Sequence, residues 1–163
     1  MTKTVPFNDL TRIHNPIEEK IMNKFSKIVK KNSFVLNKEV EEFENLFSEF
    51  SNSKFTIGCA NGTDAIELIL RSLEIGFGDE VIIPTNSYIA TAYAVSRTGA
   101  KPVFVDNDEF YLINISEIQK KISKKTKAII AVNLYGQKAD LKSLALISKQ
   151  NSIYLIEDSA QSH

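Results

Sequence analysis

The chain has 163 residues, of which 43% are hydrophobic, and its 20 basic residues balance 20 acidic ones to zero formal net charge. This composition is sufficient for the core of one globular domain, and the charge balance argues against a basic surface that would hold nucleic acid by its phosphates. The longest apolar runs, such as residues 128–132, are far shorter than the roughly 20 residues of a membrane-spanning helix, and residues 1–6 lack the apolar segment of a signal peptide. The sequence therefore predicts a cytoplasmic protein that binds neither nucleic acid nor membrane.

Two amphipathic helices are predicted at the start of the chain. Residues 17–31 carry apolar side chains at helical spacing, with lysines on the opposite face. A second apolar stripe runs from Val40 to Phe50, and Asn37 stands where it can cap that helix. Glutamates in the first turn, at positions 39, 41 and 42, favour the helix dipole.

From Lys54 onward, short apolar runs alternate with segments of helical periodicity. The runs predict strands at residues 55–59, 81–83, 102–105, 128–132 and 153–156. The segments between them predict helices at residues 65–73, 89–96, 115–122 and 141–148, with Asn114 and Glu117 in a capping arrangement for the third. Strands that are apolar on both faces and alternate with helices are typical of a parallel sheet covered on two sides. The predicted fold class is α/β, and no repeat or linker marks a second domain, so we expect residues 1–163 to form a single domain.

Polar residues follow several of these strands, where ligands gather in open parallel sheets. Gly62 and Thr63 follow the first strand and open a helix, whose free N–H groups suit a phosphate. On this motif alone, an ordinary helix cap with a turn glycine is the favoured interpretation. The glycine pattern is neither a Walker loop nor a dinucleotide fingerprint.

Three later strands are followed by further candidates. Tyr88, after the second strand, can stack on a planar heterocycle or can simply pack. Asn133 follows the fourth strand and can donate to or accept from a ligand. Asp158 ends the fifth strand, where a carboxylate either serves a ligand or caps the next helix. The single cysteine, Cys59, and the two histidines leave no spacing of metal ligands and no intrachain disulfide, so we expect no metal site.

Six segments in this order carry a resemblance to one family. They are Val5-Pro6-Phe7, residues 34–44, residues 60–65, residues 76–81, residues 134–137 and residues 157–163. Together they resemble the DegT/DnrJ/EryC1/StrS aminotransferases, which implies an aspartate-aminotransferase-like (fold type I) large domain and pyridoxal 5'-phosphate as cofactor. One departure is Asn37, where the family usually has glycine. Since asparagine tolerates a left-handed backbone, we expect Asn37 to keep that turn.

The resemblance also implies roles for individual residues. Gly62 and Thr63 would hold the cofactor phosphate, Tyr88 would lie against one face of the pyridine ring, and Gln161 would contact the ring hydroxyl. Asp158 would pair with the ring nitrogen, and its negative charge would keep that nitrogen protonated so that the ring can accept electrons from the substrate. Less secure candidates are Asn61, Asn133 and His163.

Transamination also requires a lysine that forms a Schiff base with the cofactor. The resemblance implies that this lysine comes after the aspartate motif, and no lysine of this chain is in a matching context. We therefore expect the chain to be the N-terminal part of a large domain whose remainder is absent. The family's strand order, 3-2-4-5-6-7-1, would then leave two bare central edges, so we expect the chain alone to be inactive and poorly stable.

The implied activity is transfer of an amino group, with glutamate as donor, to a nucleotide-linked keto sugar, with C3 favoured over C4, by a homodimer. Two alternatives share the fold: a non-catalytic truncated domain, and a pyridoxal-phosphate-dependent sugar dehydratase in which histidine replaces the lysine. An NAD-dependent oxidoreductase suits the α/β pattern but lacks the glycine fingerprint after the first strand.

Overall fold

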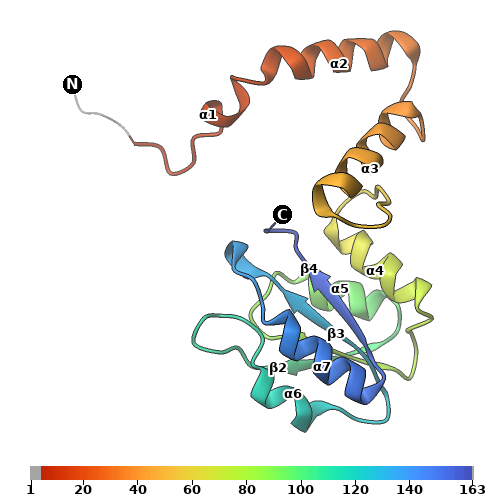
Figure 1. The fold of residues 1–163 in the computed structure, drawn as a ribbon, viewed down its shortest axis with the longest axis vertical. Helices are drawn as coiled ribbons and strands as arrows, with labels where there is room; N and C mark the ends of the chain where they lie inside the picture. The colour runs from red at the N-terminus through yellow and green to blue at the C-terminus, as the bar shows by residue number, and fades with distance from the viewer. Residues whose placement is uncertain (1–4, 163) are drawn as a thin grey trace. The chain divides into compact units, whose positions relative to one another are not determined.

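The computed structural model describes residues 5–162. The chain divides into two compact units, Met1–Gly58 and Cys59–His163, and each is described by itself (Figure 1). The single domain that the sequence predicts stays a prediction. Among the described residues, no helix combines the length and the apolar character needed to cross a membrane.

The described part of the first unit, residues 5–58, contains three helices: α1 (Thr11–His14), α2 (Glu18–Lys31) and α3 (Lys38–Ser51). The last two confirm the two predicted amphipathic helices. Both end at an asparagine in the left-handed region, Asn32 and Asn52, with φ of 52° and 51°. A left-handed residue at this position lets backbone N–H groups donate to the last carbonyls of the helix. Lys24 on α2 pairs with Glu42 on α3 at 2.9 Å, yet both side chains are more than half exposed, so this ion pair contributes little to stability.

The turn before α3 differs from the expectation. Asn37 stands at the N-cap position, but its backbone is extended with φ of −103°, and its side chain makes no capping hydrogen bond. The left-handed residue is Leu36, with φ of 46°. The turn thus comes one residue earlier than predicted, because the N-cap position itself requires a β-region backbone.

The prediction of a strand at residues 55–59 is wrong. These residues form no strand and pair with no strand among residues 5–162. The N–H of Gly58 donates instead to Oε1 of Glu44 at 2.7 Å. The apolar run supplies the composition of a strand, but a strand also needs a neighbour to accept its backbone hydrogen bonds.

The second unit is built on a four-stranded parallel sheet in the order β2-β1-β3-β4. Its strands are β1 (Glu80–Pro84), β2 (Lys101–Val105), β3 (Thr126–Val132) and β4 (Tyr154–Asp158). They confirm the other four predicted strands, and their order matches the 3-2-4-5 portion of the order expected from the resemblance. The helices between them are α4 (Gly62–Ser72), α5 (Ala90–Arg97), α6 (Ile115–Lys121) and α7 (Leu141–Asn151), with a short 3-10 turn at Leu134–Gly136.

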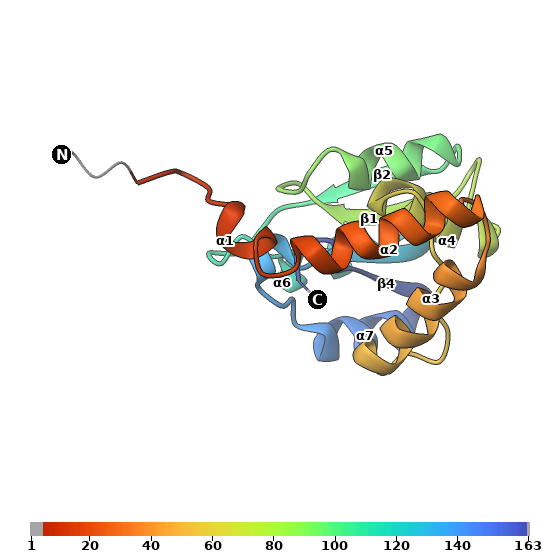
Figure 2. The same ribbon diagram turned by 90° about the horizontal axis from the view of Figure 1, so that it is seen from above.

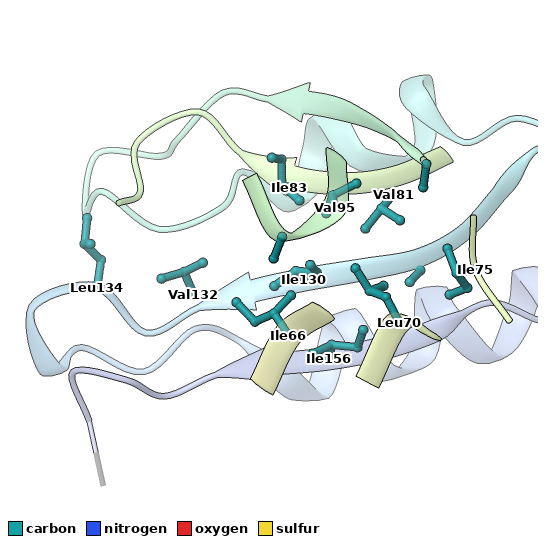
Figure 3. Packing of buried hydrophobic residues seen from close by; sticks show 13 residues of the cluster. Ile66, Leu70, Ile75, Val81, Ile83, Val95, Ile130, Val132, Leu134 and Ile156 are labelled. Atoms are coloured by element: carbon teal, nitrogen blue, oxygen red, sulfur yellow. The ribbon is translucent and has the colours of Figure 1, made fainter. Parts of the chain in front are cut away.

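Helices cover both faces of this sheet (Figures 1 and 2). Ile66 and Leu70 of α4 and Val95 of α5 pack on one face, as Figure 3 shows. Ile118 of α6 and Leu144 of α7 pack on the other face. The inner strands β1 and β3 are almost entirely buried, whereas the edge strands β2 and β4 are partly exposed. The α/β class with a two-sided parallel sheet is therefore confirmed.

Asn114 caps α6 as predicted, because its Oδ1 accepts from the N–H of Ser116 at 3.1 Å. The reciprocal half of the predicted capping box is not made: Glu117 pairs with Lys120 at 2.7 Å instead. The cap therefore rests on the asparagine side chain alone.

Glu80, at the start of β1, makes the stability of the sheet depend on pH. The Ser123 hydroxyl donates to Glu80 Oε2 at 2.6 Å, and this hydrogen bond, with a smaller contribution from Lys101, lowers the pKa of Glu80 below its ordinary value of 4.5. Because the folded pKa is lowered, the stabilisation is complete above the unfolded pKa and is lost as the pH falls through the folded pKa.

We therefore expect Glu80→Gln to lower the free energy of unfolding by about 1 kcal/mol at pH 7. The difference from wild type should shrink as the pH falls below 4.5 and through the lowered folded pKa of Glu80, because the carboxylate then takes up a proton. Urea unfolding of both proteins between pH 3 and pH 7 measures it. A difference that stays constant over this range would contradict the assignment.

Candidate functional site

The carboxyl ends of β3 and β4 open onto a cavity of about 260 Å³ that lies entirely within the second unit. Its lining residues are Asn61, Gly62, Thr63, Ile66, Tyr88, Ala90, Thr91, Val132, Leu134, Asp158, Ala160 and Gln161. Six of the eight residues singled out in the sequence are among them: Asn61, Gly62, Thr63, Tyr88, Asp158 and Gln161. The tertiary structure thus brings together residues that lie up to 100 positions apart.

Asp158 ends strand β4, and each of its carboxylate oxygens accepts one hydrogen bond. The hydroxyl of Thr91 donates to Oδ2 at 3.3 Å, and the N–H of Ala160 donates to Oδ1 at 3.2 Å. The backbone carbonyl of Asp158 accepts from the N–H of Asn133 at 3.0 Å, which continues the β3–β4 ladder by one residue. The carboxylate is therefore held at the wall of the cavity, and no cation within residues 5–162 pairs with it.

Another part of the cavity wall is the N-terminus of α4. The Asn61 side chain caps this helix by accepting from the N–H of Asp64 at 3.0 Å. Among residues 5–162, the N–H groups of Gly62 and Thr63 have no acceptor. A Cβ added at Gly62 would lie 3.7 Å from the Ala160 side chain, which is ordinary contact, so the protein itself does not demand glycine here. Two such N–H groups at the start of an 11-residue helix are donors of the kind that can bind an anion.

Tyr88 lies in the loop between β1 and α5 and is 72% exposed. This loop is held by Asn107, whose Oδ1 accepts from the hydroxyl of Thr85 and from the N–H of Asn86, both at 2.9 Å. Asn107 was not among the residues predicted from the sequence to shape the site. Its only signal was a position just after a strand, and many loop residues share that position.

Gln161 reaches across to the 3-10 turn at Leu134–Gly136. Its Oε1 accepts from the N–H of Tyr135 at 2.6 Å, which leaves the amide nitrogen to donate toward a ligand. Tyr135 and Gly136 both have positive φ, 58° and 81°, and the tyrosine conformation is uncommon for a residue with a Cβ. Gln161 therefore holds a strained turn at the rim of the cavity.

Asn133 and His163 stand apart from this set. Asn133 is buried and does not line the cavity. Its Nδ2 donates to Glu157 at 2.6 Å and to Ser159 at 3.0 Å, and its Oδ1 accepts from the N–H of Ala139 at 2.9 Å. The amide thus joins the ends of β3 and β4, and a cofactor contact by Asn133 stays a prediction. His163 lies outside the described residues.

Thr91 is the site residue that sequence reasoning missed. It is 1% exposed, it lines the cavity, and it donates to Asp158. A threonine near the start of a helix has many ordinary uses. Its partner lies 67 positions away, so no local pattern could have revealed the contact.

The cavity combines a carboxylate, an aromatic ring and a helix N-terminus with free N–H groups. This arrangement suits a planar ligand that has a protonated nitrogen and an anionic group. No lysine is among the described lining residues. Within residues 5–162, no group of three histidine, cysteine, aspartate or glutamate side chains is placed to hold a metal ion.

The fold and the cavity define the class as an α/β protein with a ligand site at the carboxyl edge of a parallel sheet. Residues 15–163 match the model of the DegT/DnrJ/EryC1/StrS aminotransferase family. The chain belongs to this family, as the resemblance predicted.

Two curated relatives illustrate the similarity. The chain is 42% identical over 160 residues to the dTDP-3-amino-3,6-dideoxy-alpha-D-galactopyranose transaminase of Aneurinibacillus thermoaerophilus, and these residues are 98% of this chain and 44% of the relative. It is 43% identical over 158 residues to the UDP-N-acetyl-3-dehydro-alpha-D-glucosamine 3-aminotransferase of Acidithiobacillus ferrooxidans, and these residues are 96% of this chain and 43% of the relative. The chain therefore spans less than half the length of these relatives.

A solved structure confirms the fold type. NtdA from Bacillus subtilis, determined with bound cofactor PMP, is 32% identical and superposes with a TM-score of 0.94 over 99% of this chain and 38% of its own. The predicted partial large domain of fold type I is thus confirmed. The family's cofactor is pyridoxal phosphate, as predicted.

Proposed function

We propose that this chain supplies the cofactor pocket of an enzyme that transfers an amino group to a nucleotide-linked keto sugar. The observation that carries the proposal is the shared cavity, whose wall contains both the carboxylate of Asp158 and the N–H groups of Gly62 and Thr63, which have no acceptor among residues 5–162. Pyridoxal 5'-phosphate has a basic ring nitrogen at one end and a phosphate near the other. The residues present therefore fit this cofactor.

In this proposal each residue binds or orients one part of the cofactor. Gly62 and Thr63 donate to the phosphate at the positive end of α4. Tyr88 covers one face of the ring, and the free amide nitrogen of Gln161 donates to the ring hydroxyl. Asp158 keeps the ring nitrogen protonated by its charge. When bound, the cofactor supplies an electron sink for breaking a substrate Cα–H bond.

The substrate and the donor belong to the same proposal. Both curated relatives carry a 3-amino or 3-aminotransferase designation in their names, which supports C3 of a nucleotide-linked keto sugar as the acceptor. We propose glutamate as the donor, a homodimer as the assembly and the cytoplasm as the location. For the 163-residue chain by itself we propose no turnover, because no described residue of the cavity wall offers the lysine amine that the chemistry needs.

The test uses two proteins: the 163-residue chain, and the product of its gene read through any coding sequence beyond His163. With glutamate and a panel of 3-keto and 4-keto sugar nucleotides, we expect the gene product to aminate a 3-keto substrate and the short chain to aminate none. Chromatography of the sugar nucleotides measures both. Amination only at C4 would contradict the C3 assignment, and failure of the gene product to bind pyridoxal phosphate would contradict the proposed function.

A further inference from the structure

We propose that Thr91 is a positioning residue, which sets the orientation of the Asp158 carboxylate toward the cofactor ring. This inference rests on the proposed function, since it names a second residue that acts on the same ring nitrogen. Thr91 touches Asp158 and not the reacting atoms, so its effect would pass through that carboxylate.

The contacts of Thr91 link two walls of the cavity. Its hydroxyl donates to Oδ2 of Asp158 at 3.3 Å. Its backbone N–H donates to the carbonyl of Tyr88 at 3.1 Å. One buried residue of α5 therefore connects the carboxylate at the end of β4 with the aromatic residue proposed to cover the ring.

Thr91 restrains the Asp158 carboxylate from a different element of the fold, helix α5. The other donor to Asp158 is the N–H of Ala160, which lies two residues away and moves together with Asp158. The terminal torsion of an aspartate is broad, so a donor on the same turn restrains the carboxylate weakly. A hydroxyl on a packed helix, fully removed from water, restrains it with respect to the rest of the cavity.

Other hydroxyls in and directly after α5 bond differently. Ser96 donates to the carbonyl of Ala92 at 3.0 Å, four residues back, and Thr98 donates to the carbonyl of Val95 at 2.8 Å. These are the local bonds that serine and threonine commonly make in helices. The hydroxyl of Thr91 donates instead to a side chain 67 positions away. This contact links two elements of the cavity wall and is not a local bond within the helix.

The experiment compares Thr91→Val with Thr91→Ser in the full-length gene product. Valine keeps the shape and the backbone N–H but removes the hydroxyl, whereas serine keeps the hydroxyl. Thr126→Val is the matched control, because Thr126 is also buried and its Oγ1 accepts from the N–H of Ser123 at 2.9 Å, away from the cavity lining. Each protein is loaded with pyridoxamine phosphate labelled with ¹⁵N in the ring, and the nitrogen shift is followed against pH.

In Thr91→Val we expect the ring nitrogen to lose its proton about one pH unit lower than in wild type, a tenfold loss of proton affinity, because a misoriented carboxylate stabilises the protonated ring less. Binding of pyridoxamine phosphate, measured by calorimetry, should weaken by about 5- to 10-fold. Thr91→Ser should titrate like wild type. Thr126→Val should lower stability and leave the nitrogen titration unchanged.

The outcomes separate the two proposals. A Thr91→Val protein that titrates like wild type would overturn the role of Thr91 and leave the proposed function standing. A wild-type protein that binds no pyridoxamine phosphate would overturn both. If valine prevents folding, Thr91→Ala takes its place with the same expected shift, and a loss in Thr91→Ser equal to that in the hydroxyl-free variant would also overturn the inference.

Discussion

Asp158→Asn is expected to lower kcat/KM of the full-length enzyme by about 10²- to 10³-fold, the size of effect seen when one preorganised charge is removed from an active site. Asparagine has nearly the same shape: its Oδ1 can still accept from the N–H of Ala160, and its Nδ2 can donate to the hydroxyl oxygen of Thr91, which donates to the native carboxylate. What it lacks is the negative charge that favours a protonated ring nitrogen. Steady-state kinetics with a keto-sugar nucleotide measure the loss.

Glu157→Gln is the control for this prediction. Glu157 is the preceding residue on β4, carries the same charge and does not line the cavity. Its Oε1 accepts from Asn133 at 2.6 Å, and glutamine keeps an oxygen for that bond. We expect kcat/KM within about threefold of wild type. Equal losses in the two variants would show that net charge at this sheet edge, and not the position of Asp158, matters.

Leu70→Ala is expected to lower the free energy of unfolding by about 3 kcal/mol. Leu70 is fully buried on α4, and it packs among side chains of the sheet that include Ile130 and Ile156 (Figure 3). Removing most of the side chain leaves a cavity between the helix and the sheet. Urea unfolding measured by circular dichroism gives the change.

The same helix offers the matched control. Leu68 has the same side chain but is 54% exposed, so Leu68→Ala should change stability by less than about 0.5 kcal/mol. Leu70 does not line the cavity, and the folded Leu70→Ala protein should bind pyridoxal phosphate within about twofold of wild type. A cost below about 1 kcal/mol at Leu70 would contradict the docking of α4 on the sheet.

The sequence predicted the second unit well because its signals are local. Apolar runs bounded by helical periodicity identified all four strands of the sheet, and Asn114 identified a helix start through a bond to a residue two positions away. The cavity residues could be proposed for a related reason. In a parallel sheet, residues that follow strands meet at one edge, so Tyr88 after β1 and Asp158 at the end of β4 could be expected to lie near each other. Gly62 also lines this cavity, although the strand predicted before it does not form.

The incorrect expectations concern features that depend on partners. The apolar run at residues 55–59 has the composition of a strand, but no strand among residues 5–162 pairs with it. Asn37 is a residue type that tolerates a left-handed backbone, yet the left-handed residue of this turn is Leu36. In both places the residue type allows a conformation, and the neighbours decide whether it occurs.

The sequence by itself determined the class of this protein: the order of its strands and helices, the residues at the sheet edge, and the motifs that place it in its family. Only the tertiary structure decided how each polar group is used. The amide of Asn133 bonds to residues 6 to 26 positions away, whereas the carboxylate of Asp158 lies at the cavity wall and accepts from Thr91 on a distant helix. The physical reason is that periodicity and capping are properties of neighbours along the chain, whereas a buried hydrogen bond is satisfied by whichever group the fold brings within 3 Å or so.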